Sequence, residues 1–204
     1  MDIKFEYLPS FLVDDKLLCE CSELYSSQYG KWSKHSPNSG KKIKLSPNAI
    51  RQWLVHPESS IYWAKDGERL IGYAIALQIQ AREGVVSWVT QLVVEEEYRH
   101  QNIAKRLLHS IWGFTDHFAW GIISANPYAI RALEKTTRRR SDPIRIKHNI
   151  HKILNIGAEY VNYLSSETDC IVKEEQSVIN TCFFVDHSNV DDMIENVVSD
   201  TVPW

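Results

Sequence analysis

The chain has 204 residues, of which 44% are hydrophobic and 24% are charged, and these proportions are ordinary for a soluble globular protein. The length predicts one domain, or one domain with an extension. The formal net charge is −3, which argues against strong, non-specific nucleic-acid binding by the chain as a whole; we expect no nucleic-acid partner. No apolar run is long enough to span a bilayer, and the N-terminal stretch lacks the apolar core of a secretory signal. We therefore expect no membrane partner.

The cysteines and histidines indicate no covalent framework and no metal. Four cysteines form no dense disulfide pattern, so we expect reduced thiols in a cytoplasmic protein. His148 and His151 share one face of a predicted helix, but no third ligand is evident, and we predict no metal site there.

The N-terminal part is predicted to contain one strand and two helices. Residues 3–8 form a short strand. Asp14 begins a helix that Gly30 ends. Ser46, followed by Pro47 in the first helical position, begins a second helix.

Three strands are predicted next, at residues 60–65, 69–79 and 85–94, because these runs are rich in β-branched and aromatic residues. Gly67 lies in the hairpin turn between the first two. The three strands should form an antiparallel meander, and the chain then changes to alternating strands and helices. This order predicts a mixed α/β domain.

The stretch from Gln91 to Trp112 is the most informative part of the chain. It reads as a strand, a turn, and a helix that begins near Asn102 and carries one apolar stripe. The first N–H groups of such a helix have no partner within it, and with the helix dipole they form an anion site beyond the strand end. A second strand at 120–125 leads into a helix that Asn126 caps.

The turn sequence Arg99-His100-Gln101-Asn102-Ile103-Ala104 resembles the pyrophosphate loop of the GNAT family of acetyl-CoA-dependent N-acetyltransferases. The family pattern is Arg or Gln, two residues, Gly, one residue, and then Gly or Ala. Arg99 and Ala104 fit this pattern, and Asn102 stands in place of the Gly. Asn tolerates positive φ better than most residues, so we expect the turn to form.

The second strand–helix unit resembles the last core motif of the same family. The matching residues are Asn126, Ala129, Glu134 and Lys135. The resemblance covers roughly residues 61–137 and implies the GNAT-like acyltransferase fold, a mixed α/β sheet, for residues 1–140. Residues 141–204 are expected to be a C-terminal extension that completes the same domain.

Within that extension we predict a helical insert at 143–164, a buried strand at 177–185 and a last helix at 190–198. The insert is expected to cap the acceptor cleft or to form a dimer contact, so a homodimer is one alternative.

The resemblance implies acetyl-CoA as the co-substrate. Backbone donors of the turn would hold its pyrophosphate, the strand edge would pair with its pantetheine arm, and the Asn at the second strand end would reach the same arm. The residues implied are Leu92, Val93, Val94, Arg99, His100, Gln101, Asn102, Ile103, Ala104 and Asn126.

The implied reaction is direct attack of a primary amine, from a small molecule or a protein, on the thioester. It requires a base for the amine and an acid for the thiolate. Leu133 stands where the family often has a Tyr acid, and Trp88 and Thr90 stand where its base is often found. The remaining candidates for proton transfer are Glu83, Glu95, His35 and Tyr128.

By the same resemblance, the acceptor would be gripped by residues between the first two strands, namely Tyr29, Trp32, His35 and Trp53. A core position for Trp53 is the alternative. The missing acid and base also allow a CoA-binding module with little activity. The run 138–140 consists of three arginines. These could bind RNA, as in an acetyltransferase that acts on RNA or charged transfer RNA, or the 3′-phosphate of CoA, or an acidic protein. The remaining alternative is a solvated helix end, where cations are favourable.

Overall fold

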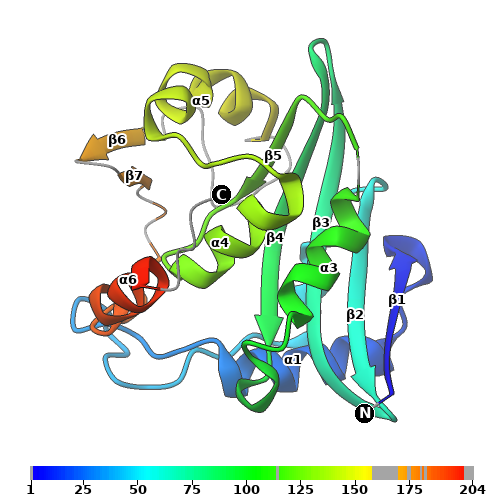
Figure 1. Cartoon of the computed structure of the whole chain (residues 1–204). Helices are drawn as coiled ribbons and strands as arrows, with labels where there is room; N and C mark the ends of the chain where they lie inside the picture. The colour runs from blue at the N-terminus through cyan, green and yellow to red at the C-terminus, as the bar shows by residue number, and fades with distance from the viewer. Residues whose placement is uncertain are drawn as a thin grey trace.

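The computed structural model describes residues 2–113, 115–157, 170–173, 176–179, 181 and 183–199. Its centre is a five-stranded sheet in the order β1-β2-β3-β4-β5. The strands are β1 (Ile3–Pro9), β2 (Ser59–Asp66), β3 (Arg69–Ala81), β4 (Gly84–Val94) and β5 (Ala119–Ile122). The first four form an antiparallel meander, and β5 pairs with β4 in parallel. This arrangement confirms the predicted mixed sheet (Figure 1).

Helices cover both faces of the sheet. The α-helices of the first part are α1 (Asp15–Gln28), α2 (Pro47–Gln52), α3 (Ile103–Trp112) and α4 (Pro127–Thr137), and two short 3-10 helices are η1 (Ser10–Leu12) and η2 (Glu96–Tyr98). The predicted caps are confirmed: the side chain of Asp14 accepts the N–H of Leu17 at 2.8 Å, and that of Ser46 accepts the N–H of Ala49 at 3.2 Å. In Figure 1, α3 and α4 lie in front of the sheet and α1 lies behind it.

Alternate residues of the strands enter two separate cores, because side chains of a strand point to opposite faces. The core on the α1 side includes Leu18, Cys21, Ile61, Tyr73, Ile75 and Val93. The core on the α3 side includes Ala64, Ile71, Ala74, Val89, Leu107, Leu108 and Trp112. β4 therefore carries one core on each face, and a ligand at its edge is within reach of both helical layers.

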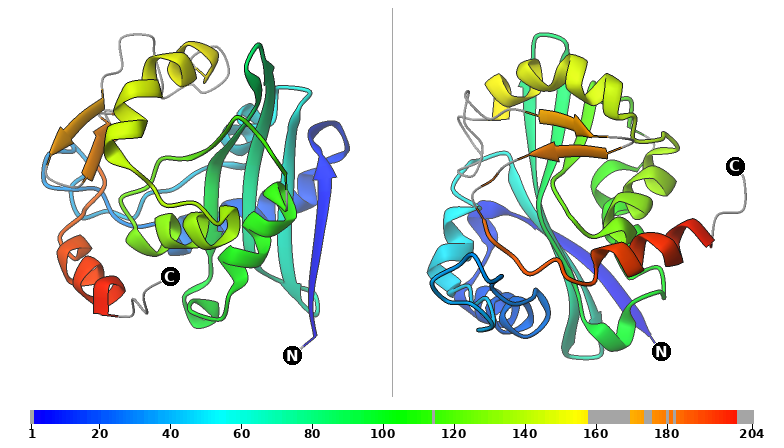
Figure 2. Two further views of the ribbon diagram at one scale, coloured as in Figure 1. Left: turned by 45° about the horizontal axis from the view of Figure 1, so that its top comes forward. Right: turned by 90° about the vertical axis from the view of Figure 1, so that its left-hand side faces the viewer.

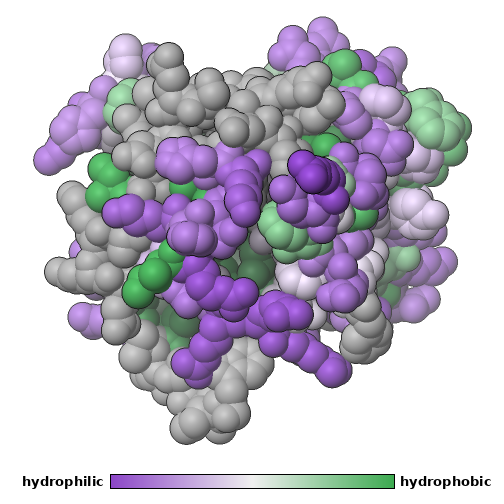
Figure 3. All heavy atoms as spheres, turned by 90° about the horizontal axis from the view of Figure 1, so that it is seen from above, coloured by the Kyte–Doolittle hydropathy of each residue, from purple (hydrophilic) through white to green (hydrophobic). Residues whose placement is uncertain are grey.

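The C-terminal elements lie at the β5 edge of the sheet (Figure 2). They are α5 (Pro143–Gly157), β6 (Cys170–Lys173), β7 (Gln176–Ile179) and α6 (Val190–Ser199). β6 and β7 form a two-stranded sheet of their own that packs near α5, and α6 packs against α4. Among the described residues no helix is both long and apolar enough to cross a membrane. Seen from the α5 end, the described surface is mostly hydrophilic (Figure 3).

Two sequence predictions are corrected by the structure. The predicted buried strand at 177–185 is wrong: β7 ends at Ile179, and the side chains of Val178, Phe183 and Phe184 are 44%, 39% and 49% exposed. The predicted strand at 120–125 also ends early, at Ile122. The helical insert is confirmed as far as Gly157, and its remainder, 158–164, lies outside the described residues. The division of the chain at residue 140 stays a prediction.

Candidate active site

β4 and β5 pair over only four residues and then part. Their last pair is Val89 with Ile122, although β4 continues to Val94. Just beyond this pair β4 has a bulge, because Ala76 pairs with Val89 and Ile75 pairs with Gln91. A bulge bends its strand and increases the local twist. No strand of the described chain pairs with β4 beyond Val89 on the β5 side, so that edge can receive an extended ligand.

The predicted pantetheine-binding residues lie on this edge. Leu92 and Val94 are half-buried against the α3-side core, and Val93 is buried in the α1-side core. On the other edge all three pair with β3. The carbonyl oxygen of Val94 accepts a hydrogen bond from Nε of Arg99 at 3.3 Å, so the main-chain groups before Val94 are those best placed for a ligand.

The turn after β4 presents free backbone donors. His100 and Asn102 have φ of 61° and 63°, and Asn102 is the N-cap of α3 without a side-chain capping hydrogen bond. Within the described chain no hydrogen bond engages the backbone N–H groups of residues 100–105. Such donors at a helix N-terminus form an anion site. Ile103 is buried and Ala104 is half-buried, so they contribute backbone rather than side-chain groups.

Arg99 and Gln101 brace this turn. The guanidinium of Arg99 donates to the carbonyl oxygen of Gln28, at the end of α1, at 3.2 Å. The side-chain oxygen of Gln28 accepts the N–H of Glu96 at 3.0 Å. Nε2 of Gln101 donates to the carbonyl oxygen of Glu97 at 2.7 Å. The side chain of Arg99 therefore positions the turn from the α1 side.

The start of α4 lies against the same turn. Asn126 caps α4, and its Oδ1 accepts the N–H of Tyr128 at 2.9 Å. The ring of Tyr128 meets the ring of His100 edge-on, with centroids 4.7 Å apart. The structure thus brings Asn126, Tyr128 and His100 together beyond the ends of β4 and β5, while Leu133 packs against the α3-side core.

The two candidate glutamates are not brought together. Glu95 follows β4 and forms an ion pair with Arg69. Glu83 lies in the turn before β4. The 11 residues of β4 between them span about 35 Å. These carboxylates cannot serve the same reaction centre together, and the carboxylate of Glu95 is already engaged by Arg69.

An aromatic ring fills the middle of β4, where a carboxylate was sought. Trp88 pairs with Gly121 of β5, and a Cβ atom added to Gly121 would lie 2.1 Å from the Trp88 ring. The Trp88 ring therefore occupies the space above β5 that a larger residue at 121 would need.

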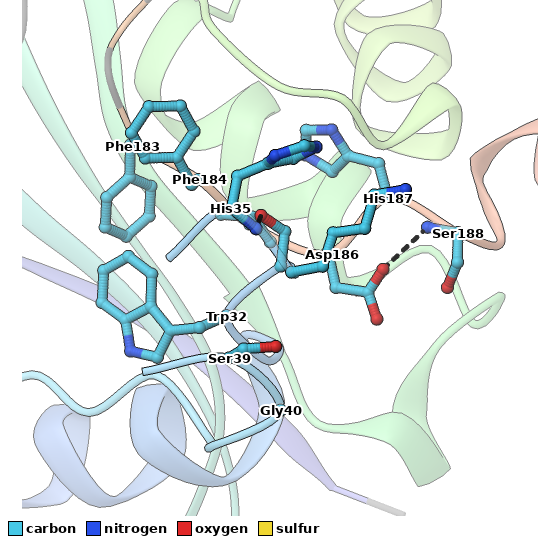
Figure 4. A pocket seen from close by; sticks show the side chains of 12 residues that line it. Trp32, His35, Ser39, Gly40, Phe183, Phe184, Asp186, His187 and Ser188 are labelled. Carbon is cyan, nitrogen blue, oxygen red and sulfur yellow. Dashed lines mark hydrogen bonds between the residues drawn. The ribbon is translucent and has the colours of Figure 1, made fainter. Parts of the chain in front are cut away.

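A pocket of about 660 Å³ lies on the α1 side of the molecule. Trp32 and His35, two of the residues expected at the acceptor end, line it together with Phe183, Phe184, Asp186 and His187. Figure 4 shows the aromatic rings on one side of the pocket and Asp186, His187 and Ser188 on the other. Tyr29 lies beside it, with its ring 6.1 Å from that of Phe183, whereas Trp53 packs against the α1-side core.

Backbone hydrogen bonds join the two walls of this pocket. The N–H of Ser33 donates to the carbonyl oxygen of Phe184 at 2.9 Å, and the N–H of Asp186 donates to the carbonyl oxygen of Lys31 at 2.9 Å. Trp32 and Val185 form a β-bridge and pack against the α1-side core. The sequence analysis did not predict the pocket wall at 183–188. The only local signal is the run Phe183-Phe184 followed by Asp186-His187-Ser188, which is typical of an aromatic and polar lining.

Phenol groups lead from the pocket toward β4. Tyr29 stacks on Tyr25 with ring centroids 4.2 Å apart, and the hydroxyl of Tyr73 donates to Oε1 of Gln91 at 2.8 Å. Burial raises the pKa of Tyr25, Tyr29 and Tyr73. These hydroxyls stay protonated at neutral pH and act as hydrogen-bonding groups rather than as bases.

A family model described as the acetyltransferase (GNAT) family matches residues 20–136, which is more than half of the chain. The chain belongs to the GNAT acetyltransferase family. As a GNAT protein it is an N-acetyltransferase, and acetyl-CoA is the co-substrate that this family uses. The free donors at residues 100–105 and the open edge of β4 suit the pyrophosphate and the pantetheine arm of that molecule.

Solved structures of acetyltransferases are similar to this GNAT chain. An aminoglycoside acetyltransferase, meta-AAC0020 from an uncultured soil metagenomic sample, in complex with sisomicin, is 14% identical, with a TM-score of 0.49 over 66% of this chain and 87% of that one. A ribosomal-protein-alanine N-acetyltransferase from Brucella melitensis biovar Abortus 2308 is 15% identical, with a TM-score of 0.48 over 69% and 94%. AAC(6')-Iy, in complex with a bisubstrate analog of CoA, is 13% identical, with a TM-score of 0.47 over 69% and 92%.

At these identities the likeness is one of fold. A comparison with curated protein sequences gives no match.

Proposed function

We propose that this GNAT protein transfers the acetyl group of acetyl-CoA to the primary amine of a small molecule that carries an apolar or aromatic group. The observation that carries the proposal is the position of two features on opposite faces of β4. The donor turn at residues 99–104 leads into α3 on one face. The pocket wall formed by Trp32 and Val185 packs on the other face, against the core that contains Val93.

This arrangement supports direct attack. The pantetheine arm would lie along the β4 edge beyond Val89, which places the thioester near the bulge and between the two faces. An amine held in the pocket would approach the carbonyl from the α1 side. Holding both reactants supplies most of the rate enhancement, and a backbone N–H of β4 would stabilise the charge that develops on the carbonyl oxygen.

The pocket suits a small acceptor. Its volume of about 660 Å³ lies in the range of small-molecule sites. Trp32, Phe183 and Phe184 offer aromatic faces for an apolar body or a cationic amine. The carboxylate of Asp186, which accepts the N–H of Ser188 at 3.0 Å, offers a polar anchor.

Proton transfer is assigned to groups that border these two regions. His35 and His187 line the pocket, and imidazole is the side chain best suited to take up a proton near neutral pH. Tyr128, beside the donor turn, is the candidate that protonates the departing thiolate. Glu83 and Glu95 border neither the pocket nor each other, and we assign them no role.

The test is release of free CoA from acetyl-CoA with a panel of aromatic and aliphatic primary amines. We expect turnover with aromatic amines. Phe184→Ala and Asp186→Asn should raise KM for the amine about tenfold and leave KM for acetyl-CoA unchanged. Phe11→Ala is the matched control, since Phe11 is 78% exposed and lies outside the pocket. Absence of turnover with every amine, or equal effects of Phe184→Ala and Phe11→Ala, would refute the proposal.

A further inference from the structure

Charge is strongly segregated along this chain. Residues 99–152 contain 11 of the 23 Lys and Arg residues but only three of the 26 Asp and Glu residues. The rest of the chain holds 12 basic residues and 23 acidic ones. The net charge of −3 therefore conceals a basic middle segment, which runs from the donor turn through α3, β5 and α4 to most of α5.

The basic side chains of this segment are on the surface. Arg106 is turned toward β1, with its guanidinium 3.9 Å from the Phe5 ring. The other exposed ones after the donor turn are Lys105, Lys135, Arg138, Arg139, Arg140, Arg145, Lys147 and Lys152, and we call them the basic face. α3 and α4 are neighbours: the hydroxyl of Thr136 lies 3.5 Å from the carbonyl oxygen of Lys105. Seen from the α5 end, hydrophilic residues are spread over much of the described surface (Figure 3).

The acidic groups within the segment leave this face positive. Glu134 binds Arg131 at 3.0 Å and accepts the N–H of Ser141 at 2.9 Å. Asp142 accepts the N–H groups at the start of α5, including that of Ile144 at 2.9 Å. These two carboxylates are thus turned to internal partners. The third acidic residue of the segment, Asp116, is exposed, so a single free carboxylate stands against the exposed cations.

An aromatic hollow lies within the basic face. A cavity of about 160 Å³ between the ends of α3 and α4 is lined by Trp120, Arg138 and three threonines. The guanidinium of Arg139 lies 5.6 Å from the Trp120 ring, and the ring of His117 stacks on the same indole at 6.3 Å. Guanidinium and aromatic planes set among cations are the groups on which unpaired bases stack.

We propose that the basic face binds single-stranded nucleic acid, with its phosphates along the arginines and lysines of α4 and α5 and a base at Trp120. An acidic protein would meet the same charge, but it would not use the aromatic hollow. The 15 residues of α5 make a helix of about 22 Å, which matches several consecutive phosphates. This surface is distinct from the acceptor pocket, and the inference does not depend on acetyl transfer.

The test is fluorescence anisotropy with a labelled single-stranded RNA of about 20 nucleotides, at salt concentrations from about 50 to about 200 mM. The same sequence as single-stranded DNA and as a duplex, and a poly-glutamate chain, serve as further probes. We expect binding that weakens with salt, and weaker binding of the duplex and of poly-glutamate. Equal binding of poly-glutamate, or no binding of the RNA, would overturn the proposal.

Variants locate the surface. R138Q/R139Q/R140Q should weaken RNA binding about tenfold or more and reduce the salt slope by about two, since each phosphate contact contributes roughly 0.7 to the slope. Trp120→Leu should weaken single-stranded binding about fivefold or more. The control K41Q/K42Q/K44Q removes the same charge from the exposed loop before α2 and should leave binding unchanged.

An equal loss in that control would mean that only overall charge matters and would refute the assignment. One more arm addresses the cofactor. If the triple arginine variant keeps its RNA affinity but raises KM for acetyl-CoA and not for the 3′-dephospho form, then the arginines serve the 3′-phosphate of the co-substrate, and the nucleic-acid proposal is wrong.

Discussion

Asn102 is the N-cap residue of α3, and it also lies where the pyrophosphate is expected to bind. Its φ of 63° is a conformation that Gly adopts freely and that Asn and Asp tolerate better than other residues. Its side chain makes no capping hydrogen bond. The position can therefore be changed in charge with little change in fold.

We predict that Asn102→Asp weakens CoA binding about tenfold or more, because the new carboxylate opposes an anion at the helix N-terminus. The thermal midpoint should stay unchanged or rise, since an acidic residue favours that end of the helix dipole. Calorimetric titration with CoA, beside a thermal melt, measures both effects. Asn102→Gly is the control that should keep the affinity; unchanged binding by Asn102→Asp would show that the pyrophosphate lies elsewhere.

Tyr73 and Gln91 form a polar pair inside the α1-side core. The Tyr73 hydroxyl donates to Oε1 of Gln91 at 2.8 Å, and within the described chain Nε2 of Gln91 is buried without a hydrogen-bond partner. Since a buried polar group without a partner is costly, the remaining hydrogen bond matters for stability.

Tyr73→Phe should therefore lower the free energy of unfolding by about 1–3 kcal/mol. The double change Tyr73→Phe with Gln91→Met removes both polar partners and should cost less than the single change. Urea unfolding of the wild type, Tyr73→Phe, Gln91→Met and the double variant measures this. A double variant that loses the sum of the two single losses would contradict the explanation.

At the scale of elements, the parting of β4 and β5 depends on how closely they pair before the bulge. Trp88 pairs with Gly121 in the parallel register. The residues on either side of the bulge, Val89 and Gln91, pair with Ala76 and Ile75 of β3. Close packing at this pair is therefore a condition for the geometry of the open edge that follows it.

Gly121→Ala should lower the free energy of unfolding by about 1–3 kcal/mol, because the added Cβ would lie 2.1 Å from the buried Trp88 ring. The same change made beside Trp88→Leu should cost less, because the smaller side chain frees the space. Denaturant unfolding of the wild type, the two single variants and the double variant completes this double-mutant cycle. Additive losses of unfolding free energy would exclude the steric cause.

Element positions were largely predictable from the sequence, and the reasons are local. Asp14, Ser46 and Asn126 cap helices as their types predict, and Asn102 supports the left-handed turn. The strand predicted at 177–185 was wrong, because β-branched and aromatic residues indicate only a suitable surface, whereas a strand needs a neighbour with which to pair. Those residues instead form a short hairpin and a pocket wall.

The bulge in β4 and the positive φ of His100 had no signal in the sequence. The donor turn could be placed because its residues are contiguous. The pocket could not be predicted, because Trp32 meets Val185 across a chain separation that no periodic pattern records.

At the scale of the whole molecule, the pocket exists only where those two distant segments meet. We predict that Val185→Asp raises KM for the amine about tenfold or more, because a charge on this half-buried residue disfavours the packed wall. The affinity for CoA should be unchanged, since no residue of the donor turn lines the pocket. Steady-state kinetics and CoA titration check this. Val55→Asp, at a residue 76% exposed, is the control, and equal effects of the two changes would contradict the prediction.

The bridge between Trp32 and Val185 has a consequence for how this protein can diversify. Under the proposed assignment, two short segments, near residues 32–40 and 183–188, recognise the acceptor. The residues expected to bind the co-substrate lie between these segments in the sequence. During evolution, substitutions in either segment can change the amine specificity while the binding site for acetyl-CoA stays the same. Swapping residues 183–188 between related enzymes is thus a direct way to redirect the activity without rebuilding it.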